Sequence, residues 1–127
     1  MGSNFYGYLL YGAKRCAQIA AALSSQGIRV DYIAGIDPTA LFPGQSPMVI
    51  GPNVDLVHEF WSERFFPLNL PLINRKWKPS GKGGGKFIYS NPATPHKHFD
   101  IPTGHIATAG HKTTRNVIAA KVLELTH

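Results

Sequence analysis

The chain has 127 residues, 43% of them hydrophobic, and its formal net charge is +6. This length fits a single domain over residues 1–127, and the apolar content excludes a chain that is disordered throughout. No apolar run reaches the roughly 18 residues of a membrane span and the N-terminus lacks the pattern of a signal peptide, so we expect a cytoplasmic protein.

The first part of the chain predicts a strand, a helix and a second strand. Residues 4–10 are aromatic and apolar, which is typical of a short strand. From Ala13 onward, AKRCAQIAAALSSQG repeats apolar residues at three- and four-residue steps as far as Gly27, a natural helix terminator. Its single cysteine, Cys16, excludes an internal disulfide and is expected to pack as a small hydrophobe. Residues 32–36 are apolar on both faces, as in a parallel sheet covered by helices, and the three elements predict a right-handed βαβ unit.

The rest of the chain alternates short strands with irregular segments. Residues 38–53 carry four prolines and are expected to form a long loop, and NVDLVHEFW follows as a strand. Residues 62–85 form an irregular basic and aromatic excursion. KFIYS and HKHFDIP are short strand candidates, and HKTTRNVIAAKVLEL is a helix that Thr113 or Thr114 would cap. The apolar face of this last helix is expected to contain Val117, Ile118, Lys121, Val122 and Leu125.

These elements predict an α/β fold, with a small, mainly parallel sheet and flanking helices. Asp37 ends an apolar strand, and His105 lies in a loop directly ahead of the last helix. Side chains at the carboxyl ends of parallel strands project into the crevice where α/β proteins bind ligands. An acid at such a strand end is placed to orient the imidazole of a histidine that acts as a general base.

Three motifs resemble the C-terminal half of an α/β-hydrolase of the lipase and esterase type. AGIDPTA is similar to the strand-end motif that carries the acid in lipases, and TGHIAT is similar to the histidine loop before the final helix. PNVDLVHEFW resembles the strand that follows the acid in this family. The family's triad runs in the chain order serine, acid, histidine. The resemblance therefore implies that Asp37 is the triad acid and His105 the triad base.

The resemblance also implies a degenerate nucleophile elbow. The motif Gly-x-Ser-x-Gly corresponds to YLLYG, so Leu10 stands at the serine position and Tyr8 at a position that normally holds glycine. The amide of Tyr11 would donate to the oxyanion. Because leucine carries no nucleophile, we expect this chain to be inactive alone as an ester hydrolase unless another subunit supplies a serine. Its substrate would be a small ester or acyl compound.

The alternative function is a non-catalytic interaction or assembly module. The segment that resembles the hydrolases lacks the strands that precede the elbow in that family. Residues 4–10 are therefore expected to form an exposed sheet edge. Such an edge favours a homo-oligomer or a partner chain, with the basic, aromatic excursion as a further contact surface. We do not expect nucleic acid as a partner, although NRKWKPSGKGGGK combines basic residues with Trp77.

Two further patterns are candidate ligand sites. HKHFD places His96, His98 and Asp100 on one strand face at two-residue spacing, which is compatible with a metal. Without a third ligand assigned, an exposed polar face is the preferred interpretation. SGKGGGK is not a phosphate loop, because Lys86 is followed by Phe87 instead of serine or threonine. We expect neither a metal nor a cofactor.

Overall fold

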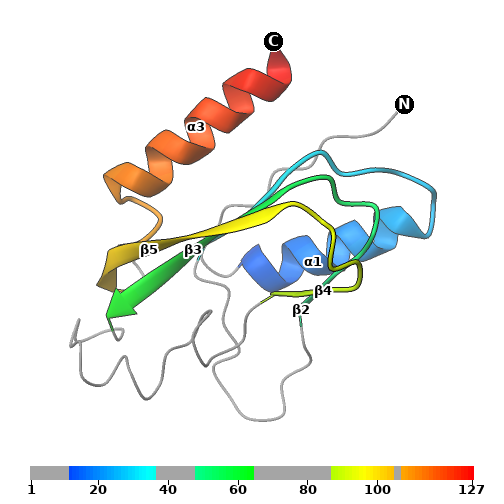
Figure 1. The fold of residues 1–127 in the computed structure, drawn as a ribbon, viewed down its shortest axis with the longest axis horizontal. Coiled ribbons are helices and arrows are strands. Elements are labelled where there is room, and N and C mark those ends of the chain that lie inside the picture. The colour runs from blue at the N-terminus through cyan, green and yellow to red at the C-terminus, as the bar shows by residue number, and fades with distance from the viewer. Residues whose placement is uncertain (1–11, 37–47, 65–86, 105–106) are drawn as a thin grey trace.

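The described parts of the chain form an α/β fold of two helices and two small parallel sheets (Figure 1). The computed structural model describes residues 12–36, 48–64, 87–104 and 107–127. The elements in chain order are α1 (Gly12–Ser24), β1 (Ile33–Ile36), β2 (Met48–Ile50), β3 (Val57–Arg64), β4 (Phe87–Tyr89), β5 (His96–Gly104) and α3 (Lys112–Thr126). The predicted fold class is confirmed. The strand expected at 4–10, and with it the crossover of the βαβ unit, lies outside the described residues.

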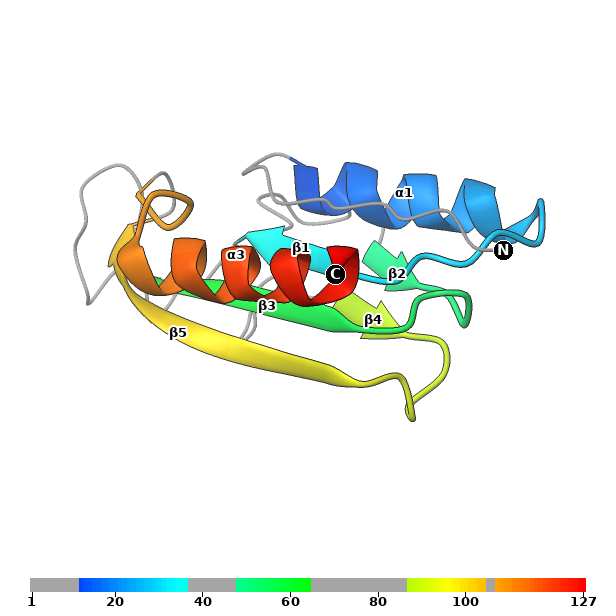
Figure 2. The same ribbon diagram turned by 90° about the horizontal axis from the view of Figure 1, so that it is seen from above.

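Three parallel strands form the main sheet, in the order β1-β3-β5. Ile33 pairs with Val57, and Val57 pairs in turn with His96, so the three strands run side by side in one direction (Figure 2). The strands predicted from the segments around these residues are therefore confirmed. The structure extends β3 through Arg64, so the first three residues of the expected excursion belong to a strand.

The expectation of an unbroken loop over residues 38–53 is wrong, because β2 lies within it. Met48 and Ile50 are buried and Val49 is exposed, which is the alternation of a half-buried strand. β2 pairs in parallel with β4, with Met48 opposite Phe87. A three-residue strand flanked by prolines carries little local signal, and its partner lies far away in the sequence.

Helix α1 ends where the sequence predicts. Gly27 has a φ of 71°, a left-handed conformation that glycine adopts without steric cost. The N–H of Gly27 donates to the Ser24 carbonyl, and the N–H of Ile28 donates to the Leu23 carbonyl, each at 3.0 Å. These two bonds make a Schellman motif, which satisfies carbonyls that the helix end leaves free.

The two helices lie on opposite sides of the main sheet (Figure 1). A hydrophobic cluster lies between the sheet and each helix. Ile33 belongs to the cluster on the α1 side, whereas Ala34 and Ile36 belong to the cluster on the α3 side. This alternation is the period of a strand buried on both faces. The α1-side cluster contains Cys16, Ala17, Ala20, Val30, Ile33, Met48, Ile50, Val54, Val57 and Phe87. The α3-side cluster contains Tyr32, Ala34, Ile36, Phe60 and Ile101.

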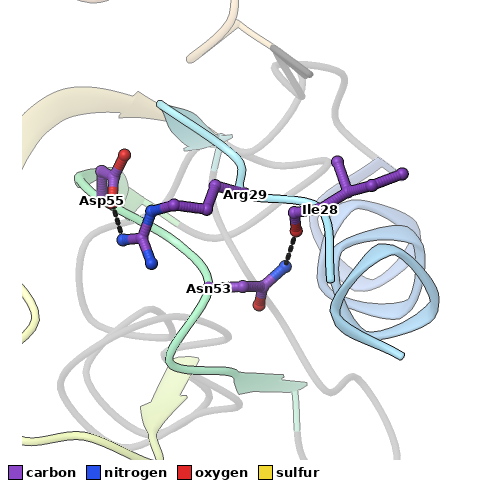
Figure 3. Close-up of polar contacts among 4 residues, drawn as sticks. All are labelled: Ile28, Arg29, Asn53 and Asp55. Atoms are coloured by element: carbon purple, nitrogen blue, oxygen red, sulfur yellow. Dashed lines mark hydrogen bonds and ion pairs between the residues drawn. The ribbon is translucent and has the colours of Figure 1, made fainter. Parts of the chain in front are cut away.

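Asn53 connects the end of α1 to the beginning of the main sheet (Figure 3). Its side-chain amide donates to the carbonyl oxygens of Ala20 and Ile28, at 2.9 and 3.0 Å. Arg29 and Asp55 form an exposed ion pair across the same junction. Asn53 is only 8% exposed. Its side-chain N–H groups therefore take the place of water as donors to one carbonyl of α1 and one of the loop after it.

Helix α3 begins differently from the prediction. Its N-cap is His111, whose imidazole Nδ1 accepts from the Thr113 N–H at 3.2 Å, so the expected threonine cap is wrong. Thr114 is instead fully buried. On the apolar face, Val117, Ile118 and Leu125 pack against the α3-side cluster. Neither described helix is long and apolar enough to cross a membrane.

Strand β5 lies at an edge of the main sheet within the described part of the chain. It carries Lys97, two exposed histidines and Pro102, which is also exposed. Charged side chains and proline hinder a further strand from pairing with such an edge. β5 is therefore poorly suited to accept a strand from another chain.

Candidate functional site

All four site residues predicted from the resemblance lie outside the described residues: Asp37, His105, Leu10 and Tyr11. The strands that lead into two of them are described. Asp37 follows the last residue of β1, and His105 follows the last residue of β5. Because β1 and β5 are parallel to β3 between them, both strands have their carboxyl ends toward the same end of the sheet (Figure 2).

The two strand ends are staggered along the sheet. Ile36 at the end of β1 is level with Phe60 and, through it, with Phe99. β5 continues from Phe99 to Gly104, and at about 3.3 Å per residue it extends roughly 16 Å beyond β1. The last described residues before the acid and the histidine, Ile36 and Gly104, are therefore well separated along the strand direction.

A hydrogen-bonded turn follows β5. The N–H and the hydroxyl of Thr108 both donate to the Gly104 carbonyl, at 3.1 and 2.8 Å. Thr108 is fully buried, and the His111 N–H donates to its carbonyl at 3.3 Å. From this turn α3 runs back along the sheet (Figure 2). The chain after β5 thus reverses toward the side where β1 ends.

A cavity of about 580 Å³ lies between β3, β4 and β5, and none of the described residues that line it is a predicted triad residue. This volume is within the range of sites for small ligands. The cavity is lined by Glu59, Trp61, Phe87, Tyr89, His96, Lys97 and His98. Its position follows from strand alternation, because Glu59 and Trp61 lie on the face of β3 that bears Val57, opposite the face that packs on α3.

Glu59 is the buried acid of this cavity, with an exposed fraction of 3%. Its Oε2 accepts from the Tyr89 hydroxyl at 2.6 Å, and its Oε1 accepts from the Trp61 indole N–H at 3.2 Å. Burial, then the charge of Glu59 and the hydrogen bond to it, raise the pKa of Tyr89 above its ordinary value. The hydroxyl therefore keeps its proton at neutral pH and remains a donor to the carboxylate.

Two stacked ring pairs flank the carboxylate. The rings of Trp61 and His98 are 3.7 Å apart between centroids and tilted by 12°. The rings of Tyr89 and His96 are 4.0 Å apart and tilted by 15°. The imidazole Nδ1 of His96 also lies 2.8 Å from the Thr94 carbonyl oxygen. The cavity consequently has flat π-faces beside a buried acid.

The strand face predicted from HKHFD is confirmed as exposed and polar. His96, His98 and Asp100 are all exposed, and the His98 Nε2 lies 3.6 Å from an oxygen of Asp100. Within the described ranges, no three His, Cys, Asp or Glu side chains are grouped so that they could hold a metal ion. Cys16 is buried in the α1-side cluster, and burial raises the pKa of its thiol to about 11, consistent with its expected packing role.

Two of the residues that line the cavity, His96 and His98, were recognised from the sequence. Glu59, Trp61 and Tyr89 were missed. The signal available was the alternation Val57, Glu59, Trp61 within NVDLVHEFW, which places the acid on the same face as a buried valine. The link to Tyr89 has no local signal, because β4 reaches this face from a different sheet.

Comparisons with known proteins found no matching family model, no matching curated protein and no matching solved structure. The resemblance to the α/β-hydrolases stays a prediction from the sequence motifs.

Proposed function

We propose that this chain is a serine-hydrolase-like protein of the esterase and lipase type that retains the acid and histidine of a triad but lacks the serine. The observation that supports the proposal is that β1 and β5 have their carboxyl ends toward the same end of the sheet. β1 and β5 are parallel strands on either side of β3, and the residues after them are Asp37 and His105.

In this proposal Asp37 accepts from the imidazole N–H of His105 and selects its tautomer. The other imidazole nitrogen is then free to act as a general base. Leu10 leaves this base without a hydroxyl to activate, so the lone chain forms no acyl-enzyme. The oxyanion donor is the amide of Tyr11. A small ester or acyl compound is the implied substrate, and a homo-oligomer or partner chain through residues 4–10 is the alternative role.

The acid–histidine pair is tested by nitrogen NMR of the His105 ring in wild type and Asp37→Asn. Long-range ¹H–¹⁵N spectra report which ring nitrogen carries the proton. We expect the Nδ1–H tautomer in wild type and a changed tautomer population in Asp37→Asn, with Asp31→Asn as a matched control that leaves it unchanged. Identical His105 spectra in wild type and Asp37→Asn would falsify the pair.

The missing nucleophile is tested by restoring it. Wild type is expected to show no turnover of p-nitrophenyl esters and no labelling by a fluorophosphonate. The double substitution Tyr8→Gly and Leu10→Ser should introduce labelling, which His105→Ala should abolish. Ester turnover by wild type, or labelling that survives His105→Ala, would contradict the proposal.

A further inference from the structure

The carboxyl group of Glu59 is buried without a cationic partner among the described residues. Its two oxygens accept only from neutral donors, the Tyr89 hydroxyl and the Trp61 indole. Among the ion pairs of the described residues, none involves Glu59. An ionised carboxylate that is 97% removed from solvent is costly unless a cation neutralises it. A carboxylate has about four acceptor sites, so sites remain for further donors after these two bonds.

The nearest described lysine does not provide this cation. Lys97 borders the cavity, but its ammonium lies 5.0 Å from the centroid of the Phe99 ring. Phe99 packs with the α3-side cluster, on the opposite face of the sheet from Glu59. The lysine charge is thus directed away from the carboxylate.

The walls of the cavity are suited to a flat cation. Trp61 and Tyr89 donate to the carboxylate and also present their rings beside it, each backed by a stacked imidazole. Aromatic faces attract cations through the ring quadrupole, and a planar guanidinium or amidinium also stacks on them. Such a group has paired N–H donors that match the two oxygens of one carboxylate. A compact ammonium would neutralise a carboxylate but would make less contact with the flat ring faces.

We propose that this cavity binds a small planar organic cation of the amidinium or guanidinium class, with Glu59 as counter-ion and Trp61 and Tyr89 as walls. The cation completes the hydrogen bonding of the carboxylate and lies against the two rings. The site is formed by β3, β4 and β5 and does not depend on the proposed hydrolase function.

The probe is benzamidine, and its uncharged isostere benzamide is the matched control. Binding is followed by the indole N–H signal of Trp61 in ¹H–¹⁵N spectra, assigned by comparison with Trp77→Phe. Benzamidine is expected to shift the Trp61 signal with saturation and to bind at least about tenfold more tightly than benzamide. Equal affinities, or no shift with benzamidine at millimolar concentration, would overturn the proposal without any substitution in the protein.

A pair of charge-neutralising substitutions locates the counter-ion. Glu59→Gln keeps the size of the side chain and should weaken benzamidine binding at least about tenfold. Glu124→Gln removes the same charge from an exposed position on α3 and should leave the affinity unchanged. Equal losses in both variants would show attraction by net charge alone and would reject the site. If Glu59→Gln does not fold, Tyr89→Phe and the benzamidine-to-benzamide ratio in wild type decide the question.

Discussion

The two faces of the main sheet differ in what they bury. Toward α3, Phe60 is fully buried and stacks on Phe99 at 5.2 Å between centroids, within an apolar cluster. On the other face, the neighbouring residue Glu59 is almost as deeply buried but lines a cavity. One strand thus contributes apolar packing to one side and a buried, hydrogen-bonded carboxyl group to the other. Burial alone therefore does not separate the two faces; the chemistry of the buried group does.

The apolar face is tested at Phe60, where the greatest loss of stability is expected. Phe60→Ala removes a fully buried ring and should lower the free energy of unfolding by about 3–5 kcal/mol. Chemical denaturation measures the loss. Ile88→Ala, at a strand position that is 50% exposed, should change stability by no more than about 0.5 kcal/mol. Similar losses in the two variants would mean that the α3 face is not the better packed one.

The next effect concerns the junction that holds α1 on the opposite face. Asn53→Ala leaves the carbonyls of Ala20 and Ile28 without their donors and should lower the free energy of unfolding by about 2–3 kcal/mol. Asn91→Ala is the control, because the Asn91 side chain accepts a single hydrogen bond in an exposed turn. A denaturation midpoint for Asn53→Ala equal to that of the control would contradict a structural role for this amide.

A pair of matched hydroxyl deletions compares the two faces directly. Tyr89→Phe removes a donor to the buried carboxylate of Glu59 and should lower the free energy of unfolding by about 2 kcal/mol. Tyr32→Phe, on the α3 face, removes a hydroxyl that contacts His58 at 3.0 Å and should cost about 1 kcal/mol. The order of the two losses in urea denaturation is the test. A larger loss for Tyr32→Phe would contradict the expectation that the hydroxyl bonded to Glu59 contributes more to stability.

The smallest effect is the pH dependence that His58 confers on the α3 face. Burial, then the charges of Lys121 and Lys97, lower the pKa of His58 below its ordinary value of 6.5. The unfolded chain therefore binds this proton more readily, so the stability contributed above pH 6.5 is lost as pH falls toward the folded pKa. The denaturation midpoint should fall from pH 7 to pH 5 more steeply in wild type than in His58→Gln.

Lys121→Met separates the causes of this pH dependence. It keeps the burial of His58 but removes a neighbouring positive charge, so the slope should lie between those of wild type and His58→Gln. Parallel midpoint curves for all three proteins would show that His58 does not titrate with folding.

Local pattern accounted for the helices and for most strands, because helical and strand periodicities are written in adjacent residues. Helix α1 and its end at Gly27 followed from apolar spacing and one glycine. The failures were β2, whose pairing partner β4 is distant in the chain, and the His111 cap. The predicted triad positions remain predictions, since Asp37 and His105 lie outside the described residues.

Apolar periodicity and the turn residues between elements were enough to predict an α/β chain with parallel strands. Chain order alone also placed Asp37 and His105 after their strands. Tertiary packing was needed to show that β1 and β5 flank β3 and run in the same direction, and that Glu59, Trp61 and Tyr89 converge at one cavity. The physical reason is that strand register and sheet packing join residues far apart in the chain, whereas periodicity reports only which side of its own strand a residue occupies.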